Sequence, residues 1–170
     1  MKKILMILAE KNFRDIEYIV PRAFFEQHNF LVTTASTKKE SVGKFGFAVT
    51  HNHAIDALNS ADFDAVILVG GLGSLDFMNN KIVQNLVEQF VTENKICAAI
   101  CAAPRNFLAW GLLKNHTATG NNFDGNFPEL CRQSGAIYSA DPVVVSKNFI
   151  TADGPESAEN FTLEIIKSLS

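Results

Sequence analysis

The stretch "KICAAICAAPRNFLAW", residues 95–110, joins two apolar runs at one cysteine, Cys101. The run that ends at Ile100 is short and bounded, as buried strands are, whereas the run from Ala102 onward has the composition of a helix. Pro104 favours a helix start at this point, because the first helical turn tolerates a residue without a backbone donor. The stretch therefore predicts a strand, a sharp turn at the cysteine and a helix.

The alternation of strands and helices continues on both sides of this stretch. Residues 65–71, "AVILVGG", form a near-continuous apolar run, which is typical of a strand buried on both faces of a parallel sheet. Pro21 is expected to kink or restart the first helix. The pattern as a whole predicts one α/β domain over residues 1–170, with a mostly parallel sheet and helices on both faces. The further expected strands are 4–8, 30–36, 117–119, 143–145 and 149–151, with a bent pair at 41–50, and the helices are 14–28, 81–93, 102–112, 128–134 and 156–169.

Composition and charge exclude several classes of protein. Hydrophobic residues make up 47% of the 170 residues and charged residues 19%, which is typical of a globular chain. A formal net charge of −3 gives no basic surface for nucleic acid, and no apolar stretch approaches the roughly 20 residues of a membrane span. The apolar run near the N-terminus, about five residues, is too short for a signal peptide. Three cysteines without a spaced framework indicate free thiols in a reducing cytoplasm.

Cys101 is the candidate nucleophile. Ala99 and Ala103 provide the small residues that a tight strand-to-helix turn needs on either side of a nucleophile. A thiol at a helix N-terminus is also near free amides and the positive end of the helix dipole, which stabilise a thiolate. The alternative is that the cysteine is a small buried hydrophobe, and we favour that interpretation for Cys97 and Cys131.

The stretch "AAICAAPRNFLAWGLL", residues 98–113, resembles the cysteine elbow of the ThiJ/PfpI superfamily, also called the DJ-one superfamily. Three further stretches resemble the same superfamily in the right order: "ILMILAEKNFRDIEYIVP" at 4–21, "DFDAVILVGGLGS" at 62–74 and "ITADGPESAENFTLEII" at 150–166. The resemblance covers nearly the whole chain. It implies a flavodoxin-like three-layer sandwich, a homodimer and a reactive cysteine that works without a metal or an organic cofactor.

The resemblance assigns Glu17 as the carboxyl group that reaches Cys101. Because two anions within about 4 Å repel each other, one of the two groups is expected to hold a proton. A protonated Glu17 would donate a hydrogen bond to the thiolate and lower the pKa of the thiol. Gly71 fits an oxyanion donor, since a glycine lets its backbone N–H approach a substrate oxygen, and the amide of Ala102 would be the second donor. The alternative is that Gly70 and Gly71 only form a tight turn.

Several positions depart from the superfamily pattern. Ala102 stands where the peptidase-like branch has a histidine, and Asn121 takes the place of another branch's histidine, although an amide cannot act as a base at neutral pH. Asp153 replaces the arginine of the closing motif, which argues against an anion pocket there. His51 and His53 have a spacing that could hold a metal, but no cysteine or carboxylate cluster completes the site, so we expect no metal.

From the resemblance we expect a cytoplasmic, Cys101-dependent protein that acts on small reactive carbonyls such as methylglyoxal, as a glyoxalase or deglycase. The sulfur would attack the aldehyde carbon to give a hemithioacetal, and Glu17 would move the proton. A second hypothesis is a redox-sensing or chaperone-like stress protein in which Cys101 is oxidised to a sulfinic acid. A third is an intracellular cysteine peptidase or amidase, which the absence of a histidine beside the cysteine disfavours.

Overall fold

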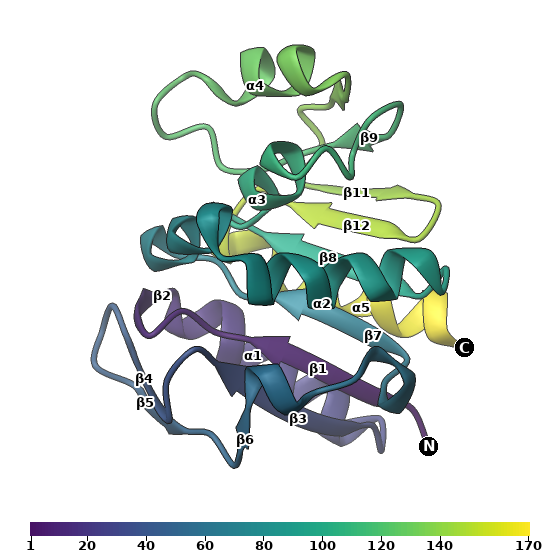
Figure 1. The fold of residues 1–170 in the computed structure, drawn as a ribbon. Helices are drawn as coiled ribbons and strands as arrows, with labels where there is room; N and C mark the ends of the chain where they lie inside the picture. Colours follow the sequence, from purple (N-terminus) through teal and green to yellow (C-terminus); the bar gives the residue numbers. More distant parts are fainter.

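A seven-stranded sheet forms the centre of the molecule in the computed structural model, which describes residues 1–170 (Figure 1). The strand order is β11-β12-β8-β7-β1-β3-β6, and all neighbours are parallel except β11 and β12. The strands are β1 (Lys3–Ile7), β3 (Leu31–Ser36), β6 (His53–Ala54), β7 (Ala65–Leu68), β8 (Ile96–Ile100), β11 (Val143–Ser146) and β12 (Phe149–Ala152). The predicted mostly parallel sheet is confirmed, and β7 is buried along its whole length, as a strand covered on both faces must be.

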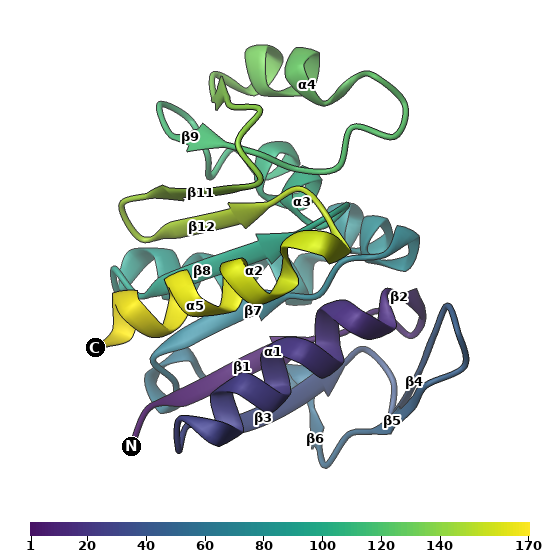
Figure 2. The ribbon, with the colours of Figure 1, turned by 180° about the vertical axis from the view of Figure 1, so that it is seen from behind.

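Helices cover both faces of this sheet. The helices α1 (Asp15–Gln27) and α5 (Ala158–Leu169) lie side by side on one face, whereas α2 (Lys81–Thr92) and α3 (Pro104–Ala109) lie on the other (Figures 1 and 2). Each long helix turns one apolar stripe toward the sheet. In α2 the buried residues recur at helical spacing: Val83, Leu86, Val87 and Phe90. The arrangement is the three-layer sandwich that the sequence predicts.

Small elements surround the sandwich. The bent pair predicted at 41–50 is present as the antiparallel strands β4 (Glu40–Gly43) and β5 (Ala48–Thr50), and β4 also pairs with β2 (Lys11–Phe13). The elements β9 (Thr117–Ala118), α4 (Phe127–Ser134) and β10 (Ile137–Tyr138) lie beyond β11 (Figure 1). The 3-10 helices are Ile55–Ala57, Ser60–Asp62, Leu72–Asn79 and Pro155–Ser157. Strands β2, β6 and β10 were not predicted, because two or three residues are too few to show an alternating pattern.

The structure corrects the predicted helices at three places. The helix α1 runs through Pro21 as one element, so the restart does not occur; the proline removes one backbone donor, while its buried ring adds to the apolar face. The helix expected over 102–112 is shorter, Pro104–Ala109, because Gly111 takes a positive φ of 72° soon after its end. The closing helix begins at Ala158, after a 3-10 turn. None of the helices is long and apolar enough to cross a membrane.

Candidate active site

Cys101 forms the sharp turn between β8 and α3. Its φ of 62° lies in the left-handed region, a conformation that costs a non-glycine residue roughly 1–3 kcal/mol and persists only where the surroundings enforce it. Two backbone hydrogen bonds enforce it here. The N–H of Cys101 donates to the carbonyl of Ala152 at 2.9 Å, and the N–H of Asn121 donates to the carbonyl of Cys101 at 2.8 Å. The predicted strand, turn and helix are all present around this cysteine.

Gly70 lets a buried carboxyl group approach the thiol. Glu17 lies in the first turn of α1 and is fully buried. A Cβ at position 70 would lie 2.3 Å from Glu17 Oε2 and 2.7 Å from the Cβ of Cys101, so Gly70 separates these two side chains without filling the space between them. The carbonyl of Gly70 also accepts a hydrogen bond of 2.9 Å from the N–H of Arg14, which ties the start of α1 to the end of β7.

Burial controls the ionisation of Glu17. It raises the pKa of Glu17 to about 8, although the Cys101 side chain, the charge of Arg14 and the amide of Gly70 each lower it. Neither carboxyl oxygen makes a well-formed hydrogen bond within the protein, so these contacts offset only part of the loss of water around the charged form. Glu17 therefore holds its proton at neutral pH.

The ionisation of Cys101 differs from the expectation. Burial and then the negative charge of Glu17 raise the pKa of Cys101 to about 12, while the amides of Gly71 and Ala102 lower it. Burial thus raises both pKa values, so the pair loses its two protons in separate steps and carries a single negative charge only above about pH 8. The sequence led us to expect that the helix N-terminus and Glu17 lower the pKa of the thiol, and that expectation left out the burial of the sulfur.

The two backbone amides that face the sulfur are those predicted as oxyanion donors. The amides of Gly71 and Ala102 both interact with Cys101 strongly enough to lower its pKa. Gly71 has a φ of 96°, and a Cβ there would lie 2.4 Å from the carbonyl oxygen of Asn12 and 2.5 Å from the nitrogen of Arg14. Only glycine fits this position, which a tight turn and a close approach of its N–H to a substrate would both require.

Cys101 opens into a cavity of about 410 Å³ at the carboxyl edge of the sheet. Asn121 lines it, as the resemblance implied, and its Oδ1 accepts a hydrogen bond of 2.9 Å from the N–H of Phe123. Arg14 also lines the cavity and was not predicted from the sequence. The residues that line the cavity are Arg14, Lys44, Gly71, Leu72, Cys101, Ala102, Asn121, Phe123, Pro155 and Glu156.

The remaining polar residues that the sequence singled out lie elsewhere. Asp153 accepts a hydrogen bond of 2.6 Å from the hydroxyl of Ser157 and does not line the cavity. No histidine lines the cavity either: His51 pairs with the hydroxyl of Ser41 at 2.9 Å, and the ring of His116 packs 4.8 Å from that of Phe149. The structure thus brings Glu17, both glycines and Asn121 to the cysteine, without a histidine.

The other two cysteines are buried in the core. Cys97 and Cys131 are both fully buried, and burial raises their pKa values to about 12 and about 11 respectively. Neither lies in the cavity that Cys101 lines. Their environment is that of small hydrophobic side chains, whereas Cys101 is part-exposed beside two amides and a carboxyl group.

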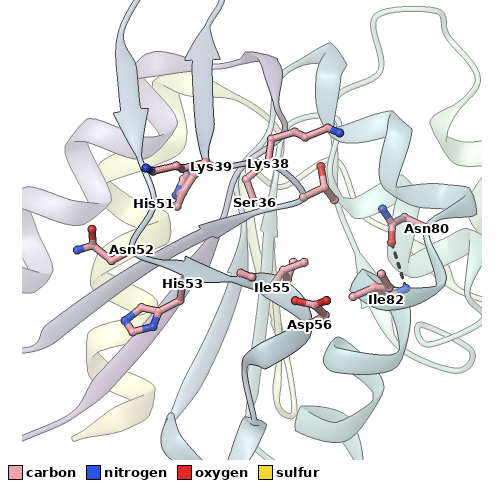
Figure 3. Close-up of a pocket in the computed structure, with 12 residues that line it drawn as sticks. Ser36, Lys38, Lys39, His51, Asn52, His53, Ile55, Asp56, Asn80 and Ile82 are labelled. Carbon is pink, nitrogen blue, oxygen red and sulfur yellow. Dashed lines mark hydrogen bonds between the residues drawn. The ribbon is translucent and has the colours of Figure 1, made fainter.

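A larger cavity, of about 500 Å³, lies at the carboxyl ends of β3 and β6, where β6 is the outermost strand on the side of the sheet away from β11 (Figure 3). Ser36 lies in its wall with a buried hydroxyl that has no partner. Asn80 uses its Oδ1 to cap α2, accepting from the N–H of Ile82 at 3.1 Å. No cysteine lines this cavity, and no carboxyl group there is paired with a nucleophile. The smaller cavity, which Cys101 lines, is therefore the candidate active site.

The fold and the site together define a class of protein. A cysteine stands at a strained strand-to-helix turn on the carboxyl edge of a parallel sheet, with two amides facing its sulfur and a buried acid beside it. Proteins of this class carry a nucleophile elbow on a flavodoxin-like sandwich. The sequence profile of the DJ-1/PfpI family matches residues 2–168, and the chain belongs to this family.

Relatives of known name share most of the chain. A Bacillus subtilis protein named as a candidate cysteine protease, YraA, is 30% identical over 171 residues, which is 99% of each chain. A Pyrococcus abyssi protein named as a deglycase is 26% identical over 166 residues, 97% of this chain and 98% of that one. The crystal structure of a ThiJ/PfpI domain protein from Brachyspira murdochii superposes with a TM-score of 0.92 at 27% identity, covering 98% of this chain and 95% of that one. The expected flavodoxin-like fold and family are confirmed.

Proposed function

We propose that the protein is a cysteine-dependent enzyme that acts on small reactive carbonyls, in the manner of a glyoxalase or deglycase. The observation that carries the proposal is the convergence of the Cys101 thiol, the Glu17 acid and the amides of Gly71 and Ala102 beside a cavity of about 410 Å³. The deglycase name of the Pyrococcus abyssi relative supports it. No cofactor is required, because each step below uses only these groups, the substrate and water.

The proposed first step joins Cys101 to a 2-oxoaldehyde such as methylglyoxal. The sulfur attacks the aldehyde carbon, a carbon–sulfur bond forms, and the carbonyl electron pair moves to the oxygen, which takes up the proton that the thiol gives up. The amides of Gly71 and Ala102, which face the sulfur, would donate to this oxygen while it carries charge. The product is a hemithioacetal.

Glu17 is the group that would complete the reaction. As a carboxylate it removes the proton from the hemithioacetal carbon while the neighbouring carbonyl oxygen takes up a proton, which gives an enediol. As an acid it then returns a proton to the neighbouring carbon while the hydroxyl on the sulfur-bearing carbon loses its proton and becomes the thioester carbonyl. Water then hydrolyses the thioester to a 2-hydroxy acid and frees Cys101, so one dicarbonyl and one water give one 2-hydroxy acid. A pKa of about 8 suits both roles, because an acid–base catalyst works best when its pKa lies near the working pH.

Turnover of methylglyoxal to lactate tests this proposal. We expect measurable turnover in the wild-type protein, none in Cys101→Ser and a loss of about a hundredfold or more in Glu17→Gln, since general acid–base groups contribute that much. Glu88→Gln, on the outer face of α2, is the matched control for the carboxyl-to-amide change and should keep wild-type turnover. Turnover that persists in Cys101→Ser would contradict the proposal.

A redox-sensing role is the second candidate, and the geometry of the same pair favours it over a peptidase. Glu17, protonated at neutral pH, would donate to an oxygen bound to the sulfur of Cys101, and the missing side chain of Gly70 leaves room between them. Mass spectrometry after mild peroxide treatment separates the two candidates. Stoichiometric oxidation of Cys101 without dicarbonyl turnover would favour the sensor.

We also propose that the protein forms a homodimer in the cytoplasm, as the family resemblance implies. Exposed apolar side chains on α1 and on the neighbouring β4–β5 hairpin support a dimer: Ile16, Ile19, Val42, Phe45 and Phe47. Sedimentation equilibrium gives the mass in solution directly. A mass of one chain at micromolar concentration would remove the homodimer from the proposal.

A further inference from the structure

Two cations without an ion-pair partner line the cavity at Cys101. Arg14 precedes the first turn of α1, and Lys44 follows β4 in the turn of the β4–β5 hairpin. Every ion pair in the protein involves some other lysine or arginine. The two cations flank one ring, with Cζ of Arg14 5.0 Å and Nζ of Lys44 5.7 Å from the centre of Phe45. They therefore form a local pair that no protein carboxylate neutralises.

Hydrogen bonds between the β4–β5 hairpin and the start of α1 hold Lys44 and Arg14 close to each other. Asp15, which is buried, accepts hydrogen bonds of 3.0 Å from the N–H groups of both Phe45 and Phe47, and so fixes the hairpin turn against the start of α1. A Cβ at Gly43 would lie 2.3 Å from Oδ1 of the same aspartate, so the hairpin packs closely there. The backbone N–H of Lys44 donates to the carbonyl of Phe13 at 2.8 Å. The position of Lys44 over the cavity is thus built into the fold.

The guanidinium of Arg14 lacks an acceptor. Its Nε is buried and has no hydrogen-bond partner, which is costly for a charged donor. Glu156 is the one carboxylate among the residues that line the cavity, and it makes no ion pair with Arg14 or Lys44. Glu17, behind the cavity, is protonated at neutral pH. Two positive charges therefore face a single negative one around the nucleophile.

We infer that the cavity selects carbonyl compounds that carry a carboxylate, with Arg14 and Lys44 binding the carboxylate while Cys101 attacks the carbonyl carbon. A guanidinium matches a carboxylate through two parallel N–H donors, and the lysine adds a second positive charge. The inference rests on the proposed function and narrows it: the preferred substrate is an anionic 2-oxoaldehyde, and the product is a 2-hydroxy acid with a second carboxylate. The bonds made and broken are those already given for methylglyoxal.

Alkylation of Cys101 by a matched pair of reagents tests the anion preference without any turnover. Iodoacetate and iodoacetamide differ chiefly in the negative charge of the first. We expect the ratio of their rate constants at Cys101 to fall about tenfold in Arg14→Gln and in Lys44→Gln, as the loss of one charge-assisted hydrogen bond implies. Lys38→Gln, an exposed lysine in the wall of the other cavity, should leave the ratio unchanged. An equal ratio in all four proteins would overturn the inference.

A comparison of two substrates tests the same inference during turnover. The probes are methylglyoxal, which is neutral, and 4,5-dioxopentanoate, a 2-oxoaldehyde with a terminal carboxylate. We expect the wild-type kcat/KM to favour 4,5-dioxopentanoate by about tenfold and this preference to disappear in Arg14→Gln, through KM and not through kcat. Equal kcat/KM values for the two probes in the wild-type protein would contradict the inference. If neither compound is turned over, the proposed function fails, while the alkylation ratio still decides whether the cavity prefers anions.

Discussion

At the scale of single residues, Cys101 and Glu17 act as one titrating pair. The first proton leaves the pair at about pH 8 and the second at about pH 12, because burial raises both pKa values and the charge of Glu17 raises that of Cys101 further. Alkylation of Cys101 should therefore rise in two steps with pH in the wild-type protein. In Glu17→Gln the carboxyl group is gone, so a single step should remain.

The measurement is the rate of iodoacetamide labelling of Cys101 between pH 6 and pH 12, which spans the first step and reaches the midpoint of the second; peptide mass spectrometry resolves it from the buried Cys97 and Cys131. Glu88→Gln makes the same carboxyl-to-amide change outside the site and serves as the control, so its labelling profile should match that of the wild-type protein. Identical profiles in the wild-type protein and Glu17→Gln would mean that the carboxyl group and the thiol are not coupled.

Gly70 makes a second prediction possible at this scale. A Cβ at this position would lie 2.3 Å from the backbone carbonyl oxygen of Ile100 as well as from the Glu17 carboxyl, and backbone cannot move aside cheaply. We expect Gly70→Ala to lower the free energy of unfolding by about 1–3 kcal/mol or more, as overpacking does, and to abolish turnover. Urea denaturation measures the first effect. Gly154→Ala is the control, since its Cβ would meet nothing closer than 3.7 Å, and equal stability of the two variants would contradict the steric argument.

At the scale of elements, α3 anchors the loop that forms one wall of the cavity. Arg105 is buried in α3 and donates to both carboxyl oxygens of Asp124, at 3.0 and 2.7 Å, and to the carbonyl of Asn121 at 3.1 Å. Its guanidinium also lies over the ring of Phe123, 4.7 Å from the centre. One side chain, four residues after the nucleophile, thus positions the two loop residues that line the cavity.

The hydrogen bonds from Arg105 hold the pKa of Asp124 at about 2, below its ordinary value of 3.8. Since the folded-state pKa is the lower one, the stability that this carboxylate contributes is complete above about pH 4 and is lost as the pH falls toward 2. We expect Asp124→Asn to unfold at a lower temperature than the wild-type protein at pH 7, with the difference shrinking between pH 4 and pH 2. Scanning calorimetry across this range measures it. A difference that does not change with pH would rule out the carboxylate as its source.

The elements also show what could be predicted from sequence. Local patterns predicted the strands β7 and β8, because a strand buried on both faces reads as a continuous apolar run. They also predicted the turn at Cys101, because small residues stand on either side of the cysteine. Glu17 was placed at the site only through the family resemblance, since a helix carboxylate has no local sign of burial. Arg14 and Lys44 were missed, because the hairpin contact through Asp15 that brings them together spans about 30 residues of sequence. The ionisation of the thiol depended on three-dimensional burial, which no local pattern carries.

At the scale of the whole molecule, the buried Glu17 makes folding stability depend on pH. Its folded-state pKa of about 8 lies above its ordinary value of 4.5, so the folded protein binds more protons between these values and its stability falls as the pH rises. For each pH unit between these two pKa values, the free energy of unfolding falls by at most about 1.4 kcal/mol. Above about pH 8 this loss is complete.

We therefore expect Glu17→Gln to be more stable than the wild-type protein at pH 8.5 and to lose most of this advantage at pH 5. Urea denaturation at the two pH values, with Glu88→Gln as the surface control, measures the change. A Glu17→Gln protein that is less stable than the wild type at pH 8.5 would show that the carboxylate is stabilised by contacts that the folded structure does not contain.

The dependence of the cysteine turn on β12 has a consequence for protein synthesis. The N–H of Cys101 pairs with Ala152, and Pro155 and Glu156 line the cavity, so residues about fifty positions later complete the site. A ribosome delivers Cys101 well before these residues, and domains begin to fold as they emerge. The nascent chain therefore lacks the hydrogen bond that holds the strained turn until β12 has been translated. Until then Cys101 has the properties of an ordinary thiol, and its site is assembled only once the residues through Glu156 have been made.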